Sequence, residues 1–87
     1  MNQDEKAQSL VQRALDKARP ILSSEELLEV RQFIDANENA LALETLVGIF
    51  SEEKKAPPEG LVELVERAAM FMRMDSRTLL KHLDWKR

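Results

Sequence analysis

Residues 38–53 read ENALALETLVGIFSEE, and this stretch decides the fold. Its apolar residues recur at helical spacing and spread well beyond one stripe of the helix surface. Such a helix touches neighbours on more than one side, so we expect it to lie centrally, with Gly48 allowing another helix to approach closely. The apolar members are Ala40, Leu41, Leu43, Leu46, Val47, Ile49 and Phe50.

Helices are also predicted on both sides of this stretch, at about residues 3–22, 25–36, 59–73 and 76–84. Each carries apolar residues three or four positions apart, and no segment alternates with the period of a strand. In the second helix, Leu28 and Phe33 widen the apolar stripe. The chain is therefore predicted to be one all-α domain, residues 1–87, a small bundle of four to five helices joined by short loops.

The predicted helices are separated by recognisable stop and start signals. Pro20 should end or kink the first helix, because proline lacks a backbone donor and clashes with the preceding turn. A capping box at residues 23–26 then starts the second helix, and Asn37, which tolerates a left-handed backbone, follows its end. The consecutive prolines Pro57 and Pro58 forbid a continuous helix after residue 53.

Composition limits the classes of protein to which the chain can belong. Its 87 residues contain no cysteine, so neither a disulfide framework nor a thiolate metal site is expected. No apolar run approaches the roughly 20 residues needed to cross a bilayer, and the N-terminal sequence lacks the features of a signal peptide. We therefore expect a cytoplasmic protein that does not bind membranes.

Sequence motifs typical of metal, catalytic or phosphate-binding sites are nearly absent. His82 is the only histidine, so no histidine pair and no hydrolase triad containing histidine can be assembled. Gly48 and Gly60 stand alone and form no phosphate-binding loop. We expect no metal, no cofactor and no enzymatic activity, and His82 should be a surface or partly buried residue. Acid–base catalysis by carboxylates with His82 is the third hypothesis for the function.

Two apolar features near the C-terminus leave their role open. Met72 continues the core stripe of its helix, whereas Met70 and Met74 fit either the core or a partner surface. Trp85 fits either a lid over the bundle or an exposed anchor, with the lid slightly favoured because tryptophan adds much area to a small core.

Charge is distributed very unevenly along the chain. Residues 25–53 hold eight carboxylates and one basic residue, Arg31, so their net charge is −7, against +1 for residues 1–22 and +3 for residues 54–87. An acidic centre of this kind repels phosphate groups, so we expect no nucleic-acid binding. A charge distribution this uneven is informative about the partners of the chain more than about its fold.

The segment 22–46 resembles small bacterial immunity proteins of the Maf-type family and its relatives, which are encoded beside polymorphic or contact-dependent toxins. The shared pattern is a helix ending in Phe-Ile-Asp, a short turn with Glu, and a helix opening Leu-Ala-Leu-Glu-x-Leu. The matching residues are Val30, Phe33, Ile34, Asp35, Glu38, Leu41, Ala42, Leu43, Glu44 and Leu46. The resemblance implies a helical bundle that binds one cognate toxin domain and blocks it.

Within the acidic centre, some carboxylates are better candidates for partner contacts than others. Glu25, Glu26 and Glu29 are largely explained by the capping box and the helix dipole. The first choices are the three carboxylates in the segment that resembles the immunity proteins, and Glu52 and Glu53 extend the same surface. The predicted partner-binding residues are Asp35, Glu38, Glu44, Glu52 and Glu53.

Simpler roles remain open for two of these residues, and another function remains open for the chain. Glu38 could cap its own helix, and Asp35 could pair with Arg31 one turn earlier. The leading hypothesis is an immunity protein that covers the basic cleft of a toxin domain, for which a nuclease is the expected class. The alternative is a helical adaptor or regulator of a host protein such as a transcription factor. The sequence leaves the oligomeric state open.

Overall fold

The computed structural model describes residues 3–83, with side chains from residue 5 onward, and within this range the chain is all-α. Its elements are α1 (Gln3–Ala18), the short 3-10 helix η1 (Arg19–Ile21), α2 (Ser24–Asp35), α3 (Asn39–Glu52), α4 (Leu61–Phe71) and α5 (Ser76–Leu83). The prediction of a small helical bundle is confirmed. Trp85, for which a lid and an exposed anchor were weighed, lies outside the described residues.

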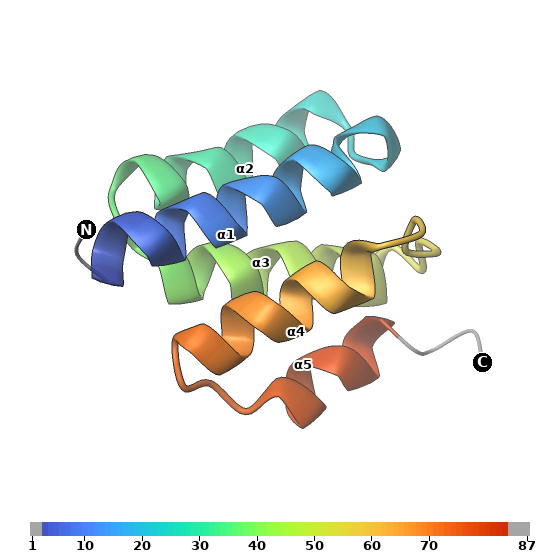
Figure 1. Cartoon of the computed structure of the whole chain (residues 1–87). Coiled ribbons are helices and arrows are strands. Elements are labelled where there is room, and N and C mark those ends of the chain that lie inside the picture. The colour runs from blue at the N-terminus through green and yellow to red at the C-terminus, as the bar shows by residue number, and fades with distance from the viewer. Residues whose placement is uncertain (1–2, 84–87) are drawn as a thin grey trace.

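The helices form two layers with α3 at the centre. In Figure 1, α1 and α4 lie side by side in front, α2 and α3 lie behind them, and α5 closes the lower edge. Helix α3 contacts α1, α2, α4 and α5, as its broad apolar surface predicts. The largest fully buried side chains include Phe50, Leu43 and Leu46 from α3, Leu15 from α1 and Leu61 from α4.

The start of α2 is fixed by the predicted capping box. The backbone N–H of Glu26 donates to Ser23 Oγ at 3.1 Å, and the Ser23 N–H donates to Glu26 Oε1 at 2.8 Å. Two backbone donors that the helix itself leaves free are thereby satisfied. Helix α1 ends at Ala18 rather than near residue 22, because Pro20 enters η1 and cannot continue the α-helical hydrogen bonds.

Three helices end on a residue with a left-handed backbone that is not glycine. These residues are Asn37 after α2, Lys54 after α3 and Arg73 after α4, with φ values of 60°, 52° and 59°. In each case the next residue donates its N–H to a carbonyl five residues earlier, as in a Schellman motif. Asn37 has the left-handed backbone that was predicted for it. Helix α4 was predicted to run to about residue 73 but ends at Phe71, because the left-handed backbone at Arg73 turns the chain out of the helix.

Apolar residues follow the predictions only in part. Met72 packs against the core as predicted, and of the two methionines left open, Met74 also packs against the core whereas Met70 is exposed. Leu28, expected to widen the buried stripe of α2, is 68% exposed, and Leu41 on α3 is 44% exposed. Both positions lie on the sides of their helices that face away from the core, so the apolar sequence pattern overstated burial here.

Gly48 also differs from its expected role. A Cβ atom built on Gly48 would meet no atom of the described residues within 4 Å, so this glycine does not serve close packing of the described helices. It faces open space on the outer side of α3 instead.

Candidate functional site

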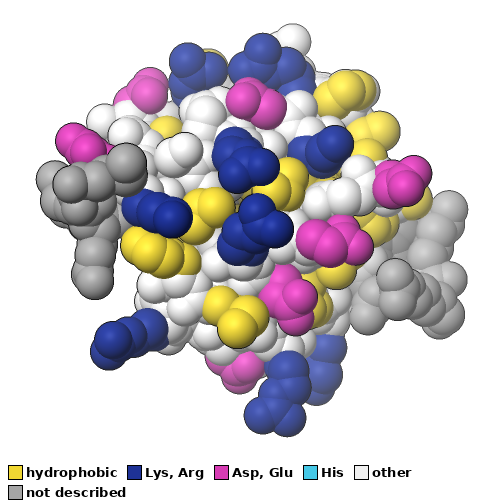
Figure 2. Space-filling model, in the orientation of Figure 1, with side chains coloured by type: hydrophobic (Ala, Val, Ile, Leu, Met, Phe, Trp, Pro, Cys, Tyr) yellow, Lys and Arg dark blue, Asp and Glu magenta, His cyan; other side chains and the backbone are white. Residues whose placement is uncertain are grey.

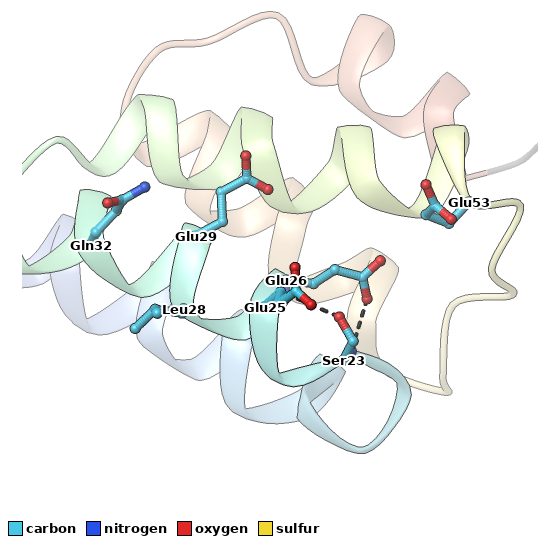
Figure 3. A pocket seen from close by; sticks show the side chains of 7 residues that line it. All are labelled: Ser23, Glu25, Glu26, Leu28, Glu29, Gln32 and Glu53. Carbon is cyan, nitrogen blue, oxygen red and sulfur yellow. Dashed lines mark hydrogen bonds between the residues drawn. The ribbon is translucent and has the colours of Figure 1, made fainter.

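The side of the bundle formed by α2 and α3 carries two adjoining hollows. The first is lined by Ser23, Glu25, Glu26, Leu28, Glu29, Gln32 and Glu53 (Figure 3). The second is lined by Glu29, Leu41, Glu44, Thr45, Gly48, Ile49 and Glu52. Because Glu29 lines both, we treat them as one surface, the α2–α3 groove. Among residues 5–83, no basic side chain lines it, and six glutamates do.

One of the six glutamates is held in place by the fold. Besides its part in the capping box, Glu26 pairs with Lys55 across the groove end, with Nζ and Oε1 3.2 Å apart. Lys55 also donates to the carbonyl oxygen of Ile21, which ties the segment after α3 to the start of α2. The hydrogen bond from the Ser23 backbone N–H, followed by the nearby Lys55 ammonium, lowers the pKa of Glu26. Glu26 is therefore a structural carboxylate.

The other five glutamates of the groove are exposed and, within residues 5–83, none of them forms an ion pair. They are Glu25, Glu29, Glu44, Glu52 and Glu53. Glu25 lies in the first turn of α2, where the helix dipole favours negative charge. Glu52 and Glu53 lie at the carboxyl end of α3, where the helix dipole disfavours a negative charge by about 0.3–1 kcal/mol each. Helix formation thus does not account for these two carboxylates.

The structure places three of the five predicted partner-binding residues in this groove. Glu44 and Glu52 line the second hollow and Glu53 lines the first. Glu44, Gly48 and Glu52 follow one another at intervals of four residues, so they form one row along α3 with the glycine between the two carboxylates.

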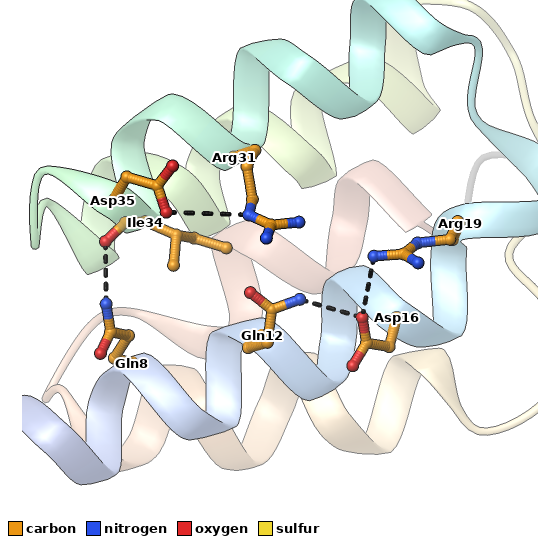
Figure 4. A network of polar contacts seen from close by, with 7 residues as sticks. All are labelled: Gln8, Gln12, Asp16, Arg19, Arg31, Ile34 and Asp35. Atoms are coloured by element: carbon orange, nitrogen blue, oxygen red, sulfur yellow. Dashed lines mark hydrogen bonds and ion pairs between the residues drawn. The ribbon is translucent and has the colours of Figure 1, made fainter.

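Asp35 and Glu38 lie apart from the groove. Asp35 lines a separate hollow between α1 and α2, and its carboxylate pairs with Arg31 Nε at 3.7 Å (Figure 4). This ion pair confirms the simpler role considered for Asp35. Glu38 occupies the N-cap position of α3, but its side chain makes no capping hydrogen bond. Its exposed side chain lies at the turn between α2 and α3, beyond the residues that line the groove.

Sequence reasoning missed several residues of the groove. Glu25 and Glu29 were assigned to helix capping and the helix dipole, yet both line it, and Glu29 joins its two halves. Leu28 and Leu41 were assigned to the core, yet both are exposed in it. The four-residue spacing of Glu44, Gly48 and Glu52 is a signal in the sequence that could have indicated an open row between two charges.

The opposite side of the bundle has a different charge. Lys and Arg side chains gather near the middle of the face formed by α1 and α4 (Figure 2). A hollow there is lined by Arg13, Asp16, Lys17, Pro20 and Leu64. Asp and Glu side chains are interspersed with these basic side chains on this face, whereas the α2–α3 groove is lined by six glutamates and, among residues 5–83, by no Lys or Arg.

Between residues 3 and 83, no group of three His, Cys, Asp or Glu side chains is placed to hold a metal ion. His82 is exposed on α5. None of the described helices is both long and apolar enough to span a bilayer.

No protein family, curated protein sequence or solved structure matches this chain.

Proposed function

We propose that this chain is a cytoplasmic immunity protein that binds a cognate bacterial toxin domain and covers a basic surface of it with the α2–α3 groove. The observation that carries the proposal is the set of five exposed glutamates that line the groove together with two exposed leucines and form no ion pair within residues 5–83. The resemblance of residues 22–46 to Maf-type immunity proteins supplies the class of partner. On this proposal the chain is an inhibitor and has no catalytic role.

Two physical features of the groove favour a protein partner. The clustered carboxylates create a negative field that accelerates encounter with a basic surface and selects against acidic ones. Leu28 and Leu41 are exposed and supply apolar area that a folded partner can bury. A nuclease domain offers such a basic surface, because it must hold a phosphate backbone.

The test uses the product of the gene next to the one encoding this chain. Co-expression of the two should restore growth of a strain that the neighbouring product inhibits. A first variant, Glu29→Lys with Glu44→Lys and Glu52→Lys, should lower the association rate at low salt by at least about tenfold and weaken the protection. A second variant reverses Asp35 and Glu38 and should have the smaller effect.

A control variant separates the groove from net charge. Glu59→Lys with Glu63→Lys and Glu66→Lys makes the same change in net charge on exposed residues beside and within α4. This variant should protect almost as well as the unchanged chain. If both triple variants weaken binding equally, net charge rather than the groove drives recognition. If the chain binds a host protein and not the neighbouring product, the adaptor function replaces the immunity function.

A further inference from the structure

The turn between α4 and α5 reverses the direction of the chain without a glycine or a proline (Figure 1). Residues 61–83 read LVELVERAAMFMRMDSRTLLKHL and contain neither residue type. The turn itself, residues 72–75, begins with Met-Arg-Met, and methionine and arginine are among the stronger helix formers. The local sequence is therefore also compatible with one continuous helix over residues 61–83.

The backbone of this turn is strained, and local hydrogen bonds hold it. Arg73 has a left-handed backbone, with φ at 59°, which is unfavourable for a residue with a side chain. The Met74 N–H closes the end of α4 by donating to the Ala69 carbonyl oxygen at 2.8 Å. The Asp75 carboxylate caps α5 by accepting from Thr78 Oγ1 at 2.8 Å. In a continuous helix the strain at Arg73 would be relieved, and ordinary helical hydrogen bonds would replace the backbone bonds of the turn.

The packing of α5 keeps it folded back. Leu79 and Leu83 are buried, and Met74 and Leu80 of the same segment pack against the core. The main contacts of α5 are with α3 and α4. A single copy that straightened at the turn would expose these side chains and the surface that they cover, so it would be unstable. A second copy that straightens at the same time offers an identical surface.

We propose that α5 is an exchangeable helix through which two copies of this chain form a domain-swapped dimer. In the dimer, residues 61–83 form one straight helix in each copy. The α5 helix of each copy packs on α3 and α4 of the other copy, as it packs on its own α3 and α4 in the monomer. Short strained turns favour such an exchange, because straightening relieves the strain while the contacts of the moved helix are kept.

The exchange leaves the α2–α3 groove intact. Within residues 5–83, the residues that line its two hollows all come from α2, α3 or positions directly beside them. The dimer therefore carries two complete grooves. The inference is independent of the proposed function, because the dimer forms from this chain alone.

Two substitutions in the turn should change the amount of dimer in opposite directions. Asp75→Ala removes the cap of α5 and inserts a strong helix former, so the dimer fraction should rise at least about fivefold. Arg73→Gly relieves the strain of the folded-back turn and disfavours the straight helix, so the dimer fraction should fall at least about fivefold. The matched control Glu66→Ala removes one carboxylate from an exposed position within α4 and should leave the dimer fraction unchanged.

The dimer fraction is measured by size-exclusion chromatography with light scattering. Each chain is first refolded from urea at high protein concentration, where association with a second copy competes with folding back. Equal dimer fractions for Arg73→Gly and Asp75→Ala would overturn the inference, and so would a monomer at every concentration for both the unchanged chain and Asp75→Ala.

A second measurement distinguishes helix exchange from association of two closed copies. Because the chain has no cysteine, Glu63→Cys with Lys81→Cys places two spin labels at exposed positions of α4 and α5. These positions are about 27 Å apart along a straight helix, whereas the axes of two packed helices lie about 8–10 Å apart. Labelled chains diluted with unlabelled chains should show the long distance in the dimer and a shorter one in the monomer. A dimer whose intrachain distance stays short would overturn the exchange. Loss of growth protection, in contrast, concerns the immunity function alone.

Discussion

Two glutamates that line the same hollow should respond in opposite ways to neutralisation. Glu26 is joined to Ser23 through the capping box and to Lys55 by an ion pair, and its side chain is 17% exposed. Glu29 lies three residues further along α2, exposed and without an ion pair among the described residues. The substitutions Glu26→Gln and Glu29→Gln therefore separate structural from surface charge.

The size of each effect follows from these contacts. Glutamine keeps an oxygen that can accept from the Ser23 N–H, so Glu26→Gln removes the charge and leaves most of the cap. The lost interaction with the helix N-terminus is about 0.3–1 kcal/mol, and the partly buried pair with Lys55 adds about 0.5–1 kcal/mol. The expected loss is about 0.8–2 kcal/mol, or a fall of roughly 3–16 °C in the thermal midpoint of a domain this small. Glu29→Gln should stay within about 0.5 kcal/mol.

The pH dependence provides an independent check on the same reasoning. Because the fold lowers the pKa of Glu26 below its ordinary value of 4.5, its contribution is fully present above that pH. It is lost as the pH falls through the lowered pKa of the folded state. The stability difference between the unchanged chain and Glu26→Gln should therefore be constant from pH 7 to about pH 5 and shrink below pH 4.5.

Urea unfolding followed by circular dichroism, repeated at pH 7, 5 and 3, measures both effects. A Glu26→Gln, Lys55→Gln double-mutant cycle isolates the ion pair, for which we expect a coupling of about 0.5–1 kcal/mol. Equal stability of Glu26→Gln and Glu29→Gln at pH 7, or a deficit that persists unchanged to pH 3, would refute the assignment of Glu26 to structure.

Other substitutions test the remaining parts of the fold. Arg73→Gly should raise stability by about 0.5–1 kcal/mol in urea unfolding, because glycine adopts the left-handed backbone that ends α4 without strain; a loss of stability would contradict that helix end. Gly48→Ala should stabilise α3 by about 0.5–1 kcal/mol, since its methyl group meets no neighbour within 4 Å, and a lower thermal midpoint would show that the position is packed after all. Phe50→Ala should lower the free energy of unfolding by about 3–5 kcal/mol, which is most of the stability expected for a domain this small. Amide exchange protection should then be lost in α1, α3 and α4, and unchanged protection would contradict a core centred on α3.

The local features of this protein are determined by short stretches of its sequence. The capping box at Ser23 and Glu26, the break at Pro20 and the left-handed turn at Asn37 each depend on a few neighbouring residues, and each is present in the structure. The position of α3 also follows from its sequence, because a helix that is apolar on several sides must be covered on several sides.

The groove depended on the tertiary structure. The sequence places Glu29 and Glu44 in different helices, and only the packing of α2 against α3 brings them to one surface while turning Asp35 toward α1. Apolar spacing likewise could not show that Leu28 and Leu41 stay exposed or that Gly48 faces open space, because burial depends on which neighbour lies opposite. The sequence alone therefore determined the helices and the total acidic charge, and the packing of helices distant in sequence decided which of those charges act together.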